Sequence, residues 1–131
     1  DSLVALAAKS GDGRIIVERA RADFTQLLAN CLISVSQAGY NTIMETLQAG
    51  ARAVAVPWAG GAETEQTLRA RLLAGRGLIE LVEEGALSAQ TLAAAIDRAA
   101  QRPRRLGPSI DLGGAQRSAA LVAQWTSELA W

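Results

Sequence analysis

Short apolar runs alternate with helical patterns along the chain, and glycine or proline bounds most of them. Runs rich in aliphatic and β-branched residues predict four strands, at residues 14–17, 32–35, 53–56 and 78–82. Glycine-bounded apolar runs that are each followed by a helix are typical of a parallel sheet covered on both faces. The pattern therefore predicts an α/β fold, a Rossmann-like parallel sheet with helices on both faces.

Apolar residues at helical spacing predict the helices between and after these strands. They are expected at residues 3–10, 23–29, 41–49, 65–76 and 89–100. A C-terminal segment at 109–131 contains a last helix, which is expected to start at Gly114. Asn41 or Thr42 fits the cap of the third helix and Ser88 the cap of the fifth. Gly50 fits the left-handed residue that follows a helix end.

Composition narrows the classes of function. The 131 residues suit a single domain, 1–131, and carry no net charge, which argues against general nucleic-acid binding. The chain has no histidine, which excludes Ser-His-Asp and Cys-His catalysis and zinc sites that need histidine. Cys31 lies in an apolar run and is expected to be a small buried hydrophobe. With no spanning run or signal peptide visible, we expect a cytoplasmic protein.

Two polar loops follow predicted strands, at the carboxyl edge where open α/β sheets bind ligands. The first contains Ser36, Gln37, Ala38, Gly39, Tyr40, Asn41 and Thr42. Gly39 would let the backbone turn tightly, and the free N–H groups at the start of the next helix would favour a phosphate. A plain turn is the alternative. Glu45, one turn further on, would either form a capping box with Thr42 or bind a ribose diol.

The second loop contains Gly60, Gly61, Glu63, Glu65 and Gln66. Its carboxylates and its amide are groups that can hydrogen-bond sugar hydroxyls. The alternative is a solvated loop in which acidic residues favour the N-terminus of the next helix. The basic stretch at Arg102, Arg104 and Arg105 is interpreted as a solvated loop after a helix.

Taken together, the two loops and their flanking strands resemble the C-terminal domain of glycosyltransferase family 28. The resemblance covers residues 14–96 and rests on S-V-S-Q-A-G-Y-N-T-I-M-E-T-L-Q-A-G-A-R-A-V-A-V-P-W followed by E-T-E-Q-T-L-R-A-R-L-L-A-G-R-G-L. It implies the C-terminal half of a two-domain B-type glycosyltransferase, which holds the nucleotide-sugar donor. The N-terminal acceptor domain and the first strand would lie upstream of Asp1, so the piece alone would be inactive.

The resemblance also assigns roles by position. The loop around Gly39 would face the diphosphate, Glu45 would bind the ribose, and Glu65 and Gln66 would reach the donor sugar. Arg21, with Ala20, would lie by the base, where relatives often carry an apolar pair. Arg69 stands where relatives have Asn in a Q-x-x-N-A pattern, and Arg69 and Arg71 would share the stabilisation of the leaving diphosphate. Since Asp-x-Asp is absent, no metal and no other cofactor is expected.

The expected function is therefore transfer of a hexosyl group from a nucleotide diphosphate sugar, with UDP-sugar expected, to an unknown acceptor. The expected partners are this donor and the N-terminal domain of the same chain, and no nucleic acid. Peripheral membrane association of the full-length enzyme is compatible with this function. A nucleotide-sugar 2-epimerase is one alternative. A non-catalytic interaction domain is the other, with Leu121, Trp125, Leu129 and Trp131 as its docking face.

Overall fold

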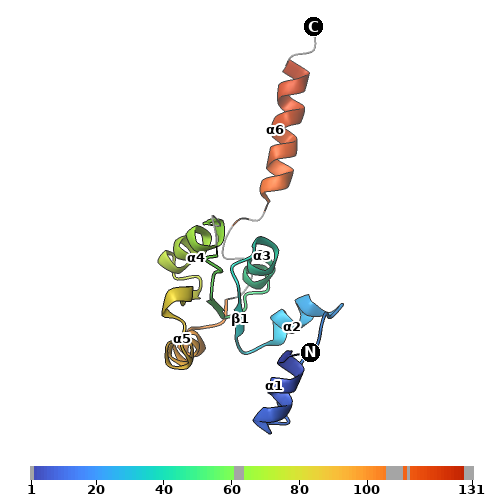
Figure 1. Cartoon of the computed structure of the whole chain (residues 1–131). Helices are drawn as coiled ribbons and strands as arrows, with labels where there is room; N and C mark the ends of the chain where they lie inside the picture. The colour runs from blue at the N-terminus through green and yellow to red at the C-terminus, as the bar shows by residue number, and fades with distance from the viewer. Residues whose placement is uncertain (1, 61–63, 106–110, 112, 129–131) are drawn as a thin grey trace.

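Three short parallel strands form the centre of the molecule (Figure 1). The computed structural model describes residues 2–60, 64–105, 111 and 113–128. The strands are β1 (Ser34–Ser36), β2 (Ala53–Ala55) and β3 (Glu80–Leu81), and they pair in the order β1-β2-β3. The other described elements are α1 (Ser2–Ser10), α2 (Phe24–Asn30), α3 (Tyr40–Gln48), α4 (Glu65–Gly75), the 3₁₀ turn η1 (Glu84–Ala86), α5 (Ala89–Gln101) and α6 (Gly114–Glu128).

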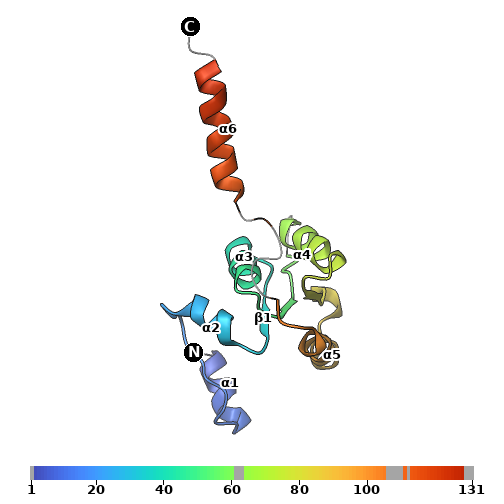
Figure 2. The ribbon, with the colours of Figure 1, turned by 180° about the vertical axis from the view of Figure 1, so that it is seen from behind.

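The central strand β2 shows why helices cover both faces of the sheet. Ala53 and Ala55 point to one face, where they pack in a buried cluster with residues of α3 and α4. Val54 points to the other face, where it packs with Ala95 and Ala99 of α5. The predicted α/β sheet with helices on both faces is thereby confirmed, and the two views of the ribbon show α5 apart from α3 and α4 (Figures 1 and 2).

Left-handed glycines end the two helices that lead into β2 and β3. Gly50 has φ of 63° and Gly77 has φ of 67°, as expected for Gly50 from the sequence. In both turns the glycine N–H and the next N–H bond back to helix carbonyls, at 3.1 Å each after α3 and at 2.8 and 2.9 Å after α4. This is the Schellman arrangement, which satisfies carbonyls at a helix end and turns the chain into the strand.

The strand predicted at residues 14–17 does not form. Arg14 is held in a turn by Asp12, whose carboxylate accepts from its backbone N–H at 3.0 Å and from its guanidinium. Ile16 is 78% exposed. No strand in the described residues pairs with this segment, and a β-branched run gains little stability without a neighbouring strand.

The arginines that follow α5 lie in a loop, as expected, but they also bind backbone carbonyls, so the loop is only partly solvated. Arg102 and Arg105 each donate to the Gly77 carbonyl at 2.6 Å, which fastens the turn after α4. Arg102 also pairs with Glu80 of β3, and Arg98 of α5 pairs with the same carboxylate at 2.9 Å. These contacts tie α5 and the segment after it to the sheet.

Arg104 likewise binds backbone carbonyls, at the end of α2. Its guanidinium donates to the carbonyls of Cys31 at 3.1 Å, of Leu28 at 3.2 Å and of Ala29. Carbonyls in the last turn of a helix have no partner within the helix, and a cation there also opposes the negative end of the helix dipole. Cys31 itself is half-buried, with its thiol 3.4 Å from the Leu28 carbonyl, instead of fully buried as expected.

Replacing Arg104 by alanine is expected to lower the free energy of unfolding by about 2 kcal/mol, since hydrogen bonds from a charged donor are lost. Urea denaturation measures the change. Arg76→Ala is the matched control, because the Arg76 side chain is exposed and makes no hydrogen bond with the described residues. Equal stability of the two variants would show that Arg104 does not hold the end of α2.

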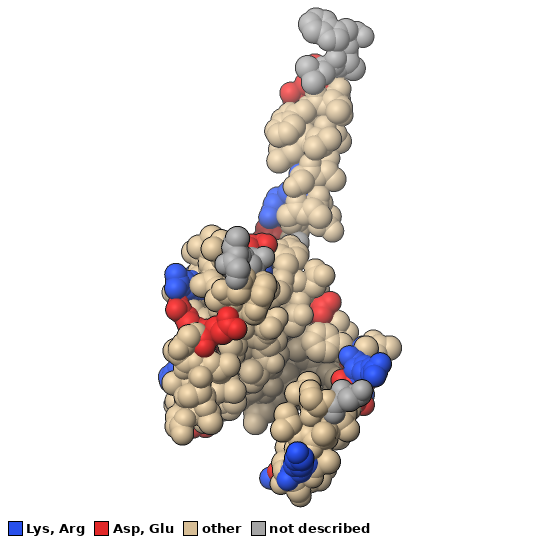
Figure 3. Space-filling model, in the orientation of Figure 1, with Lys and Arg blue, Asp and Glu red and all other residues tan. Residues whose placement is uncertain are grey.

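Helix α6 extends away from the sheet (Figures 1, 2 and 3), and its side chains are exposed throughout. Leu121 and Trp125 of the expected docking face lie on it and are not covered by described residues. Leu129 and Trp131 fall outside the described residues. Among the described residues, no helix is both long and apolar enough to cross a bilayer.

Candidate functional site

The two polar loops lie at the same edge of the sheet, as expected. The register pairs Ser36 with Ala55, and Ala55 with Leu81. The ladder continues past the strand ends, since the Val56 N–H donates to the Ser36 carbonyl at 2.9 Å. Residues 37–39 after β1 and residues 57–60 after β2 therefore leave neighbouring strands side by side, each leading to a helix.

The start of α3 presents unbonded amides. Gly39, not Asn41 or Thr42, is the capping residue, and no side chain caps the helix. The first bond of the helix runs from the Ile43 N–H to the Gly39 carbonyl at 3.0 Å. The N–H groups of Tyr40, Asn41 and Thr42 make no hydrogen bond with the residues that the structure describes. Together with the helix dipole, such groups make a positive end that favours an anion.

Gly39 leaves the space beside these amides open. Its φ of −58° and ψ of 140° are available to any residue, so the expected tight turn does not explain the glycine. A Cβ at this position would meet no atom within 4 Å, so packing within the described chain does not explain it either. Ser36 and Gly39 are half-buried and Gln37 is exposed, so the loop is accessible from solvent.

Arg69 joins the two loops. From α4 it donates to the Ala38 carbonyl at 2.7 Å, and it also pairs with Glu65 in the first turn of the same helix. Its guanidinium lies 5.4 Å from the centre of the Tyr40 ring, within the range of a cation–π contact. The side chain is only 15% exposed. A positive charge is thereby fixed next to the N-terminus of α3.

Arg71, the other arginine considered for a leaving diphosphate, points elsewhere. It pairs with Glu83 at 2.8 Å. The hydrogen bond from Arg71 lowers the pKa of Glu83, and the same bond raises the pKa of Arg71. No contact joins Arg71 to the loop after β1 in the described part of the chain, so Arg69 alone of the two reaches it.

The loop after β2 is held at two points. The Trp58 N–H lies 3.4 Å from the Gln66 side-chain oxygen, and the Ala59 N–H donates to the Glu84 carboxylate at 2.8 Å. Gly60 packs against the Trp58 indole, and a Cβ there would overlap the ring. Two residues of the expected site, Gly61 and Glu63, lie outside the described residues.

Glu45 is half-buried on α3, one turn beyond the free amides. It forms no capping box with Thr42, whose carbonyl instead accepts from the Thr46 hydroxyl at 2.7 Å. The capping interpretation of Glu45 is therefore wrong. Its carboxylate has no hydrogen bond or ion pair with any described residue, so it is available to a ligand.

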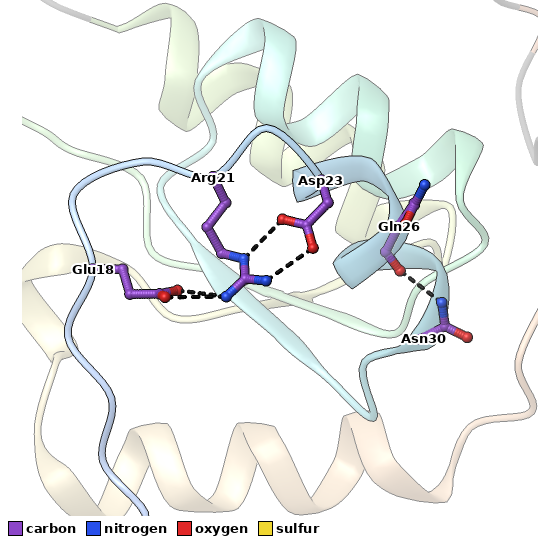
Figure 4. A network of polar contacts seen from close by, with 5 residues as sticks. All are labelled: Glu18, Arg21, Asp23, Gln26 and Asn30. Atoms are coloured by element: carbon purple, nitrogen blue, oxygen red, sulfur yellow. Dashed lines mark hydrogen bonds and ion pairs between the residues drawn. The ribbon is translucent and has the colours of Figure 1, made fainter.

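Arg21 stands apart from this group. Both Asp23 oxygens accept from its guanidinium at 2.8 Å, and Glu18 accepts from the remaining nitrogen at 2.8 Å (Figure 4). Asp23 first and Glu18 second raise the pKa of Arg21, and Arg21 lowers the pKa of Asp23. No described contact connects Arg21 with Arg69 or with the start of α3, so its place by a base stays a prediction.

Comparison with known proteins decides the family. The model of the glycosyltransferase family 28 C-terminal domain matches residues 11–125. The chain belongs to glycosyltransferase family 28. Over 87 residues it is 29% identical to the UDP-N-acetylglucosamine–N-acetylmuramyl-(pentapeptide) pyrophosphoryl-undecaprenol N-acetylglucosamine transferase of Rhodospirillum centenum, a match that covers 66% of this chain and 23% of the relative.

Solved structures agree on the fold of this family 28 domain. MurG of Acinetobacter baumannii superposes with a TM-score of 0.63 at 20% identity, over 84% of this chain and 33% of that one. The glycotransferase of kitacinnamycin gives a TM-score of 0.52 at 24% identity, over 60% of this chain and 20% of that one. The chain thus spans about a quarter of the curated relative and a third of MurG.

The family 28 domain therefore brings most of the predicted residues to one edge. The start of α3 and its preceding loop meet Glu65 and Arg69 through the contacts of Arg69, and Gln66 holds the neighbouring loop. Trp58 and Glu84 were not predicted to take part in the site, and the aromatic residue directly after Pro57 was the available sequence signal for Trp58. Among the described residues no cluster of His, Cys, Asp or Glu could hold a metal ion, and a metal-free site stays a prediction.

Proposed function

We propose that this chain is the donor-binding domain of a glycosyltransferase that moves a hexosyl group from a nucleotide diphosphate sugar to an acceptor. One observation carries the proposal: three unbonded amides begin α3 beside the open space at Gly39. Membership of a glycosyltransferase family favours transfer over epimerisation and over a role without catalysis. The printed name of the R. centenum relative, which contains UDP-N-acetylglucosamine, supports UDP as the nucleotide.

The diphosphate would bind at the start of α3. A helix N-terminus carries about half a positive charge, and its N–H groups point at the bound anion. The Arg69 guanidinium adds charge on the same loop, although its pair with Glu65 offsets part of it. In this arrangement Arg69 stabilises the negative charge that develops on the leaving diphosphate, as a fixed charge that needs no reorganisation during transfer.

The ribose would bind to Glu45. This residue lies five positions after Tyr40, which corresponds to about 7.5 Å along the axis of α3 at 1.5 Å per residue. Side chains of a helix lean toward its N-terminus, so the carboxylate approaches the amides from one turn away. Two carboxylate oxygens can accept hydrogen bonds from both hydroxyls of a ribose diol.

The transferred sugar would lie against the first turn of α4. The Gln66 side-chain oxygen faces the Trp58 N–H, which leaves the Gln66 amide NH₂ free to donate to a sugar hydroxyl. Glu65 can accept from a hydroxyl beside it. The N-terminal domain would bring the acceptor to this edge, and the cytoplasmic location and peripheral membrane association of the full-length enzyme stay predictions.

Replacing Glu45 by alanine is expected to weaken binding of the preferred nucleotide diphosphate sugar by roughly tenfold to a hundredfold. Hydrogen bonds to a charged acceptor contribute about 1.5–3 kcal/mol, and the variant loses this acceptor. Isothermal titration of the full-length protein with UDP-, dTDP- and GDP-sugars measures the effect.

Asp97→Ala is the matched control, since Asp97 is an exposed carboxylate on α5, across the sheet from α3. Its titration should match the wild type. Absence of binding to every donor, or equal affinity of Glu45→Ala and the wild type, would count against the proposed function.

A further inference from the structure

We infer that Trp58 is a stacking platform for the pyranose ring of the transferred sugar. The inference rests on the proposed function and adds a contact with the ring of the transferred sugar. It starts from an exposed aromatic side chain at the ligand-binding edge of the sheet. Trp58 is 46% exposed and belongs to neither hydrophobic cluster of the domain.

The backbone around Trp58 is fixed on both sides. Pro57 before it is fully buried at the end of β2. The Trp58 N–H faces Gln66 of α4, and the next N–H, that of Ala59, donates to Glu84 of η1. An aromatic ring whose flanking backbone is already held in place loses little conformational entropy when a ligand binds.

Gly60 fixes the indole itself. A Cβ on Gly60 would overlap the ring, with the indole nitrogen 2.8 Å away, so the edge of the indole that carries this nitrogen lies against the glycine. Gly60, which the sequence predicted to contact the donor, thus packs against the indole and limits where the ring can lie. Since the loop contacts this edge of the ring and nearly half of the residue is exposed, an apolar surface remains for a ligand.

The chemistry of this surface suits a pyranose. A sugar ring has an axial face of C–H groups and a rim of hydroxyls. The C–H face carries a small positive charge and packs against the negative face of an aromatic ring. Gln66 lies next to the Trp58 backbone, so its free NH₂ group is placed to bind a hydroxyl at the rim. Trp58 and Gln66 together can recognise both parts of the sugar.

The test compares two ligands, the nucleotide diphosphate sugar and the same nucleotide diphosphate without the sugar. Full-length wild type, Trp58→Leu and Trp58→Phe are titrated with each. Trp58→Leu is expected to weaken binding of the sugar donor about tenfold and to leave binding of the bare nucleotide unchanged. Trp58→Phe, which keeps an aromatic face, is expected to show a smaller selective loss. Trp125→Leu on the distant helix α6 serves as the control and should alter neither affinity.

The outcomes separate this inference from the proposed function. If the wild type binds neither ligand, the proposed function fails. If the wild type binds both, and Trp58→Leu changes both affinities equally or neither, the platform is overturned. Thermal unfolding of each variant checks that it is folded. If Trp58→Leu does not fold, Trp58→Phe and Gly60→Ala replace it, since a Cβ at residue 60 displaces the ring. The inference fails if neither variant loses affinity for the sugar donor while keeping its affinity for the bare nucleotide.

Discussion

Gly50→Ala is expected to lower the free energy of unfolding by about 2–5 kcal/mol. Two costs add at this position. An L-residue with Gly50's φ of 63° loses about 1–2 kcal/mol. In addition, the new Cβ would overlap the backbone carbonyl of Arg105, with the carbonyl carbon only 3.2 Å away, and backbone held by side-chain contacts cannot move aside cheaply.

Gly77→Ala provides the matched comparison. Gly77 ends α4 in the same way with φ of 67°, but the nearest atom to its Cβ is the tip of the Arg102 side chain at 4.0 Å. This variant is expected to lose only the conformational part, about 1–2 kcal/mol. Urea denaturation of both variants measures the difference, and equal losses would show that residue 105 does not press on the turn after α3.

Gly39→Ala is expected to reduce affinity for the nucleotide diphosphate sugar about a hundredfold in the full-length enzyme. The added methyl group occupies the open space beside the first amides of α3 and holds a phosphate away from them. Loss of one or two charge-assisted hydrogen bonds costs about 3 kcal/mol, which corresponds to this factor.

The same substitution should barely change stability. Since φ of −58° suits alanine, the lower entropy of the unfolded chain roughly offsets the poorer capping residue, and we expect a net change within about 1 kcal/mol. Gly75→Ala, on α4 with open space around its Cβ, controls for adding a methyl group elsewhere and should leave affinity intact. Wild-type affinity in Gly39→Ala would exclude close approach of the phosphates to this residue.

The sequence predicted the elements whose signals are local. Helical spacing and the Ser88 cap predicted α5, and the structure confirms both, with Thr91 completing a capping box. The segment at residues 14–17 shows the limit, because its β-branched residues specify a strand only when another strand lies beside them. The cap of α3 was misplaced by two or three residues, since Gly39, Asn41 and Thr42 are all residue types accepted at a helix N-terminus.

Contacts between distant residues could not be predicted. Arg104 reaches the carbonyl of Leu28, 76 positions away, and Arg69 reaches that of Ala38, 31 positions away. Nothing in a basic stretch tells which carbonyl each guanidinium will meet. The two loops of the site were predicted because strand ends and helix starts are local signals, whereas the joining of these loops by Arg69 depends on the packing of α3 and α4 on one face.

Arg69 links the loop after β1 to the first turn of α4 through a single guanidinium. A shift of the Ala38 carbonyl is expected to reach the first turn of α4, because one mostly buried guanidinium contacts both that carbonyl and Glu65. Under the proposed function, a shift of this carbonyl on phosphate binding would therefore reach Glu65, which is proposed to contact the transferred sugar.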